Sequence, residues 1–332
     1  MNNTSSKIET LFQQTKTVCF GRFMIDLPQS AQLVWGPMAV PYKMSVFPGQ
    51  GHKIKAQIKA TVDEMSSEKH RTEPSMLIGV FDSVNPDSKI VVGYNNQTDS
   101  IFVKLDSFIR LGNTAFVQSI SRAGMGYTDT DGTRKLNKYA YKQEVAYLLK
   151  EARLLRLRNE NEIPSEHGVC IEEGFIAVPL DYRTERIAIG FRFPELPDVT
   201  LSVATRNTDQ PSEYGTLKAA REAGREAAME MGLGSLYRRI KTLREQNRTI
   251  GQWEGAEALS RLPSNRDIPE THEFNFISPG SAKDLLRPHV RIKLYTGVKE
   301  NSRGQVPPSL TDAEAIALWD KLTSTIRVRP VK

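Results

Sequence analysis

Apolar and polar residues alternate along much of the chain, and this period of two is typical of strands with one buried face. In one of the clearest stretches the apolar residues alternate with Arg186, Ala188, Gly190 and Arg192. The N-terminal stretch, Thr17–Leu27, is expected to be one continuous strand. The predicted strands are Thr17–Leu27, Gln32–Trp35, Tyr42–Phe47, Met76–Phe81, Ile101–Leu105, Ala115–Ile120, Val169–Pro179, Ile187–Phe193, Val199–Val203, Ala256–Leu262, Phe274–Ile277 and Val290–Tyr295.

Four segments repeat their apolar residues every three or four positions, which predicts amphipathic helices. They are Ile54–Met65, Lys135–Arg158, Ser212–Met231 and a last helix that begins after Thr311, where Thr311 and Glu314 form a capping box. The expected inward faces consist of Ile54, Ile58, Val62 and Met65; Tyr141, Val145, Leu148, Ala152 and Leu155; Leu217, Ala220, Gly224, Ala227 and Met231; and Ala315, Leu318, Trp319, Leu322 and Ile326.

Each half of the chain has strands, then a helix, then more strands, and ends on a helix, which predicts an α+β fold with helices packed on antiparallel or mixed sheets. A length of 332 residues suits two domains. The polar segment Asn159–His167 contains Pro164 and has no apolar period, so it is the expected boundary. We therefore expect domains at residues 1–160 and 161–332.

The net charge is +6 and is spread along the chain, which is more typical of a soluble globular protein than of a dedicated nucleic-acid binder. No apolar run reaches the ~18 to 20 residues that span a bilayer. The polar segment Met1–Thr10 lacks the features of a secretory signal. This start fits either a cytoplasmic protein or one whose signal has been removed.

Sequence motifs for common enzymes are absent. The chain contains neither the G-x-S-x-G of α/β-hydrolases nor a P-loop. Gly232-Leu233-Gly234 begins like a dinucleotide motif, but Tyr237 replaces the third glycine and a helix precedes it, so a helix end is the better interpretation. Asp129–Gly132 resembles part of a calcium loop, yet Tyr127 and Lys138 occupy two ligand positions, which favours a turn before a helix.

The histidines offer no local metal site or Cys-His site, and neither a metal nor another cofactor is expected. A hydrolase whose triad assembles from distant residues is still open. A further alternative uses the basic stretch from Arg238 to Arg248, in which Arg238, Lys241 and Arg248 would form one helical face for phosphates or an anionic surface. The five histidines are His52, His70, His167, His272 and His289.

The chain has two cysteines, Cys19 and Cys170, which lie in different halves. They fit either one long-range disulfide in an oxidising compartment or two buried, reduced thiols. The sequence pattern leaves both possibilities open.

Segments at both ends of the chain resemble a known family. They are 18–28, VCFGRFMIDLP, and the C-terminal LWDKL and IRVRP at 318–322 and 326–330. Together with Gly174-Phe175-Ile176 and Glu185-Arg186-Ile187, they resemble the immunity proteins that neutralise class-four type VI secretion lipase effectors. The resemblance covers nearly the whole chain.

This resemblance implies a periplasmic, non-catalytic protein whose two α+β domains clasp a cognate lipase effector, hold its lid and block its active site. The effector would be the partner, nucleic acid would not, and the free protein is expected to be a monomer that does not span a membrane. An oxidising periplasm would favour pairing of Cys19 with Cys170. For the contact region we expect the cleft between the halves near Asn159–His167, a prediction that charge-reversal variants test.

Overall fold

The fold comes from a computed structural model that describes residues 3–124, 126–128, 134–136, 140–181, 183–211, 215–265 and 268–332. The helices are α1 (Asn3–Leu11), α2 (Ile54–Ser67), α3 (Tyr141–Arg153), α4 (Leu217–Glu230), α5 (Gly234–Tyr237) and α6 (Asp312–Thr323). The strands are β1 (Thr15–Phe20), β2 (Phe23–Pro28), β3 (Gln32–Ala39), β4 (Lys43–Phe47), β5 (Leu77–Asp82), β6 (Lys89–Asn96), β7 (Asp99–Leu111), β8 (Thr114–Gly124), β9 (Gly126–Thr128), β10 (Arg134–Leu136), β11 (Leu155–Leu157), β12 (Val169–Ile171), β13 (Gly174–Ile176), β14 (Arg186–Phe193), β15 (Leu196–Arg206), β16 (Lys241–Ile250), β17 (Trp253–Leu262), β18 (Thr271–Ser278), β19 (His289–Tyr295) and β20 (Arg327–Val328).

The chain forms two compact units that are not contiguous in sequence. Unit 1 contains the chain as far as Gly36, Glu160–Cys170 and Leu180–Lys332, and unit 2 contains Pro37–Asn159 and Ile171–Pro179. The expected division into residues 1–160 and 161–332 differs from these units at the N-terminal segment and at Ile171–Pro179. The physical reason is strand pairing, because β2 pairs with β20 in unit 1 and β13 pairs with β11 in unit 2.

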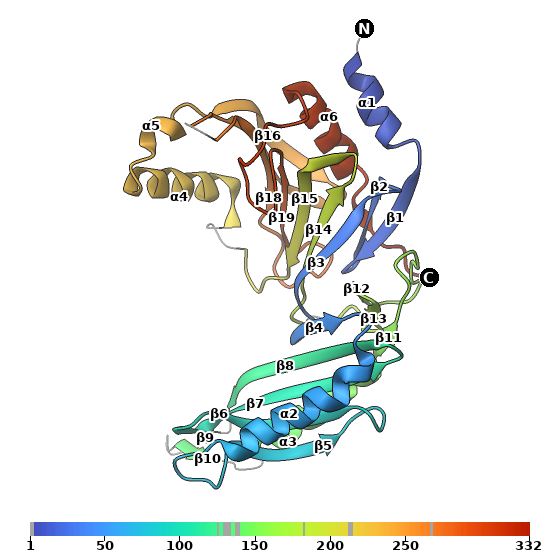
Figure 1. Ribbon diagram of the computed structural model, residues 1–332, viewed down its shortest axis with the longest axis vertical. Helices are drawn as coiled ribbons and strands as arrows, with labels where there is room; N and C mark the ends of the chain where they lie inside the picture. Colours follow the sequence, from blue (N-terminus) through green and yellow to red (C-terminus); the bar gives the residue numbers. More distant parts are fainter. Residues whose placement is uncertain are drawn as a thin grey trace. The chain divides into compact units, whose positions relative to one another are not determined.

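The main sheet of unit 1 has the strand order β16-β17-β18-β19-β15-β14-β3 (Figure 1). Buried and exposed side chains alternate along its strands, so the sheet has one face in the core and one face outward. Along β15, for example, Leu201 and Val203 are buried while Ser202 and Ala204 are exposed. The inner face carries Phe274, whose ring lies 6.0 Å from that of Trp319 on α6, so this helix closes the core as its capping box and apolar face predict.

The outer face of the same sheet is partly covered by α4, which packs through Leu217 and Ala220 on β17 and β18. The predicted inward face of this helix is wrong at its C-terminal end. Met231 is 66% exposed, and a Cβ at Gly224 would meet no described atom within 4 Å outside its own helix. The contacts of α4 with the sheet come from its N-terminal part, whereas its last residues are largely exposed and contact the short helix α5.

The expected continuous strand at Thr17–Leu27 is instead a hairpin of β1 and β2, which pair from Thr15↔Pro28 to Phe20↔Phe23. A two-residue turn joins them, and Gly21 adopts a φ of +56°, which a glycine allows without strain. Because the turn contains only Gly21 and Arg22, it interrupts the apolar pattern too briefly to be recognised in the sequence.

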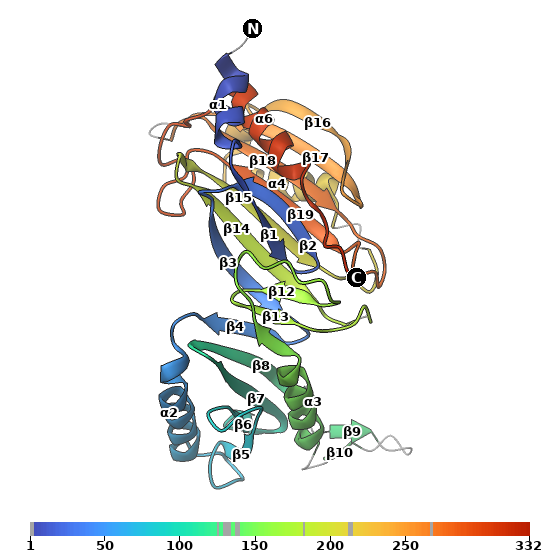
Figure 2. The same ribbon diagram turned by 90° about the vertical axis from the view of Figure 1, so that its right-hand side faces the viewer.

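Unit 2 is built on the strand order β4-β8-β7-β6-β5, with a helix on each face (Figure 2). On β6, Ile90 and Val92 contact the α3 side, whereas Val91 lies with Ile54 of α2. A strand buried on both faces is apolar throughout and does not alternate. This explains why β6 was not predicted from an alternating pattern.

The helix predicted at Lys135–Arg158 is shorter at both ends. It begins at Tyr141 and ends at Arg153, after which Leu155–Leu157 forms β11 and pairs with β13. The apolar period continues into this strand because Leu155 is also buried, now by the small sheet β11-β13-β12. The α+β class predicted from the sequence is confirmed in both units.

The core of unit 2 allows a direct test. Leu148 on α3 is fully buried against β6 and β7, so Leu148→Ala is expected to lower the free energy of unfolding by about 2–5 kcal/mol. Gln143→Ala, on an exposed position of the same helix, is the control and should change it by less than about 0.5 kcal/mol. Chemical denaturation measures both, and equal effects would contradict the assigned packing.

Candidate functional site

The basic stretch from Arg238 to Arg248 does not form the helical face that the sequence suggested. Arg238 caps the short helix α5, and Lys241 to Arg248 belong to strand β16. The prediction is wrong because β16 pairs along its length with β17, and this pairing overrides the local helical spacing. The three cations of the expected face therefore do not form one helical stripe.

Two arginines of this strand are held by acidic residues of unit 1. Arg244 donates two hydrogen bonds to Asp320 on α6, at 2.8 and 2.5 Å. Arg248 donates to Glu257 at 2.7 Å and to Thr323 at 2.8 Å. These bonds join the edge of the sheet to α6, so the two guanidinium groups stabilise the fold and are not free to bind phosphates.

At the centre of this network, Glu257 is a carboxylate with no exposed surface. It also accepts a hydrogen bond of 2.9 Å from the indole of Trp319. Burial alone would raise the pKa of Glu257, but the hydrogen bonds from Arg248 and Trp319 and the charges of Arg248 and Arg244 outweigh burial and hold it below its usual value. Glu257 is therefore ionised and paired at neutral pH.

A triad-like arrangement forms around His272. Its Nδ1 lies 2.9 Å from Thr296 Oγ1, and its Nε2 lies 3.0 Å from Asp312 Oδ1. Thr296 is 1% exposed and His272 is 3% exposed, so the hydroxyl group does not face a substrate. The geometry is that of a structural link between β18, the end of β19 and the first turn of α6, and it gives no support to the scattered-triad hypothesis.

The remaining sequence motifs do not form sites. Gly232 follows the end of α4 with a φ of +72°, which confirms a helix end at this position. The calcium-like sequence Asp129–Gly132 lies outside the described residues. Within the part of the chain that the structure describes, no group of three or more His, Cys, Asp or Glu residues is arranged to hold a metal ion. No described helix is both long and apolar enough to cross a membrane.

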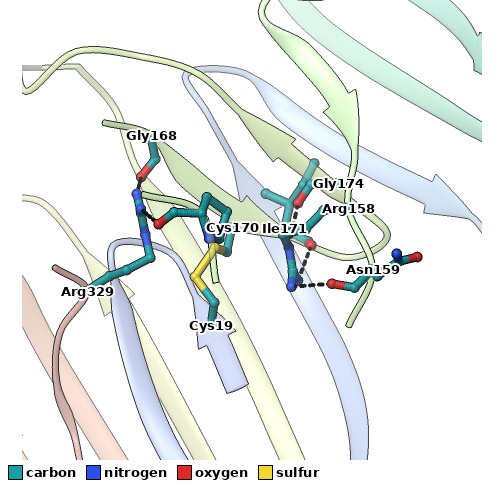
Figure 3. The surroundings of a disulfide bond; sticks show 9 residues. Cys19, Arg158, Asn159, Gly168, Cys170, Ile171, Gly174 and Arg329 are labelled. Carbon is teal, nitrogen blue, oxygen red and sulfur yellow. Dashed lines mark hydrogen bonds between the residues drawn. A yellow bond between two sulfur atoms is a disulfide. The ribbon is translucent and has the colours of Figure 1, made fainter. Parts of the chain in front are cut away.

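The two cysteines lie together in unit 1 (Figure 3). A disulfide joins Cys19 on β1 to Cys170 on β12, with 5.8 Å between the Cα atoms, and both side chains are fully buried. Next to it, the backbones of Gly21 and Cys170 exchange two hydrogen bonds of 2.8 Å. The N-terminal hairpin is thus fixed to a segment 151 residues further along the chain.

The expected linker is also held by hydrogen bonds. Arg329, which is buried, donates to the carbonyl oxygens of Pro164 and Gly168, the latter at 2.9 Å (Figure 3). Lys16 forms an ion pair of 2.8 Å with Glu160. Most of the segment 159–167 is therefore part of unit 1 and does not behave as a free connection.

Comparison with known families places the chain in the class of two-domain immunity proteins. Residues 16–158 match the N-terminal domain of Tle cognate immunity protein 4, and residues 162–331 match its C-terminal domain. The chain belongs to this family, which confirms the resemblance found in the sequence.

Solved structures have the same fold. The chain is similar to the immunity protein in a crystal structure of a Tle4–Tli4 complex, with 22% identity, a TM-score of 0.75 and coverage of 96% of this chain and 98% of the other. It is similar to apo TplEi, a type VI immunity protein from Pseudomonas aeruginosa, with 22% identity, a TM-score of 0.72 and the same coverage. A TplEi structure with an "L" peptide gives 22% identity, a TM-score of 0.71 and coverage of 96% and 99%. No curated protein matches the chain.

Glu257 makes the stability depend on pH. Because its pKa is lower in the folded state, its contribution is present above the ordinary glutamate pKa of ~4.3 and is lost as the pH falls through the folded-state value. Glu257→Gln should lower the free energy of unfolding at pH 7 by about 1–3 kcal/mol and flatten its decline in acid. Denaturation at several pH values measures this. The exposed Glu254 on the same strand provides the control, Glu254→Gln, which should leave the pH profile as in the wild type.

The disulfide gives a second prediction. Denatured, non-reduced protein should titrate close to zero thiols, and reduction should release two. Replacing both cysteines by alanine should lower the free energy of unfolding by roughly 2–5 kcal/mol, because the bond closes a very long loop in the unfolded chain. Reduced wild-type protein is the matched comparison, and two thiols before reduction would show that the bond is absent.

Proposed function

We propose that this protein binds a cognate type VI secretion lipase effector and inhibits it by covering the lid and blocking access to the active site. The observation that carries the proposal is the family match, which extends over both 16–158 and 162–331. The fold supports it, since 96% of the chain superimposes on an immunity protein crystallised with Tle4.

The protein acts as an inhibitor and has no catalytic role in this proposal. Two observations support this part. The sequence has no G-x-S-x-G motif, and the triad-like group around His272 encloses its hydroxyl in the core of unit 1. A stoichiometric inhibitor instead requires a stable surface, which two folded units supply.

The periplasm is the proposed location, because a lipase effector that attacks membrane phospholipids from that side must be neutralised there. The buried bond between Cys19 and Cys170 suits this compartment, since disulfides form and persist in oxidising surroundings. The nucleic-acid alternative has lost its main support, since Arg244 and Arg248 are bound by acidic side chains.

The test is a titration of the protein into a phospholipase assay of the cognate effector, with calorimetry in parallel. Activity should fall in proportion to the added protein and reach its minimum near one equivalent, because a tight complex removes one enzyme per inhibitor. The protein alone should release no fatty acid.

An unrelated phospholipase serves as the control and should keep its activity at the same protein concentration. Full effector activity at several equivalents, together with no heat of binding, would overturn the proposal. Turnover by the protein alone would overturn its non-catalytic part.

A further inference from the structure

The outer face of the main sheet in unit 1 has an open part beside α4, formed by β14, β15 and β19. We call it the arginine trough. Its side chains project from alternate positions of these strands, all on the face opposite the core. The trough consists of Arg186, Ala188, Gly190, Ser202, Ala204, Arg206, His289, Arg291 and Lys293.

Strand register brings the positive side chains together. Arg186 is paired with Arg206, and Arg206 is in turn paired with His289, so these three residues form one row across the sheet. Arg291 lies two positions along β19, opposite Ala204. Like charges directly opposite each other destabilise a sheet, so this row lowers the stability of the fold. Nothing in the packing of the sheet requires cations at these positions.

The described part of the chain places no neutralising carboxylate on the arginines of the trough. Arg186, Arg206 and Arg291 are exposed, and none of them forms an ion pair with a carboxylate of the described residues. The opposite face of the sheet differs, since Arg244 and Arg248 each have acidic partners there. Burial lowers the pKa of His289, and the charges of Arg206 and Arg291 beside it lower the pKa further.

The floor between the cations is made of small side chains. Ala188 lies opposite Ala204, and Gly190 lies opposite Ser202. A pocket of about 410 Å³ lies at the arginine end of this floor, where it is lined by Ala204 together with Arg186, Arg206, His289 and Arg291, among others. Side chains this short allow another polypeptide to approach the sheet closely while the arginines contact its charged groups.

We propose that the arginine trough binds a carboxylate-bearing segment of the effector. Guanidinium groups bind carboxylates through paired hydrogen bonds, and three of them spread over three strands suit several carboxylates along one polypeptide. Among the described residues, the pocket is lined by no Phe, Tyr or Trp on which a nucleic-acid base would stack, His289 being its one aromatic ring, and by no large apolar residue that would insert into a lipid bilayer. The inference rests on the proposed function and names the chemistry by which it is carried out.

The test compares two charge reversals in the full-length protein. Arg206→Glu changes the centre of the trough, whereas Arg225→Glu makes the same charge change at an exposed position on α4. We expect Arg206→Glu to raise the Kd for the effector by at least tenfold and to reduce its salt dependence, because a repulsive carboxylate replaces an attractive cation. Arg225→Glu should stay within about twofold of the wild type. Arg291→Gln, which only removes a charge, should raise the Kd by about three- to tenfold.

Thermal unfolding of each variant establishes that the fold is retained. If the wild type binds the effector and Arg206→Glu binds as tightly, the trough inference is overturned and the proposed function stands. If the wild type does not bind, both are overturned. Binding of the wild type to phosphatidylglycerol vesicles that Arg206→Glu loses, with effector affinity unchanged, assigns the trough to a lipid surface and also overturns the inference.

Discussion

The fold of unit 1 depends on contacts between its N-terminal hairpin and segments much later in the sequence. The hairpin β1–β2 buries apolar side chains on both faces, yet most of the unit consists of residues after Leu180. Three links hold the hairpin in place: the disulfide between Cys19 and Cys170, the pairing of β2 with β20, and the ion pair of Asp26 with Arg327 at 2.9 Å. Without these links, the hairpin would no longer cover the core that α6 and the sheet form.

The sequence predicted those elements whose pattern depends only on local burial. Strands β14 and β15 alternate because one face is in the core, and α6 begins directly after its N-cap Thr311 because its capping box is complete within four residues. Prediction failed where a partner distant in sequence decides the outcome. The apolar run of β6 requires a helix on each face, and Gly21 turns the chain within a pattern that otherwise looks continuous.

Partners distant in sequence also explain why the two basic regions were judged differently from the sequence. The Arg238 to Arg248 stretch was conspicuous in the sequence, but its neutralising groups come from the next strand, β17, and from α6, whose Asp320 is 76 residues away from Arg244. The arginine trough was inconspicuous, because Arg186, Arg206 and Arg291 are far apart in sequence and meet only through strand register. The alternation of arginine with alanine and glycine along β14 was the one visible signal, and it shows which residues face outward without showing what lies beside them.

The order of segments has a consequence for how the chain assembles during synthesis. Most of unit 2 is an insertion within unit 1, because Pro37–Asn159 lies between the hairpin and the strands that complete it. All of unit 2 therefore precedes β14 in the chain, whereas the strand that pairs with the hairpin, β20, lies at residues 327–328. Unit 2 can therefore complete its fold during synthesis while unit 1 still lacks the partners of its N-terminal hairpin.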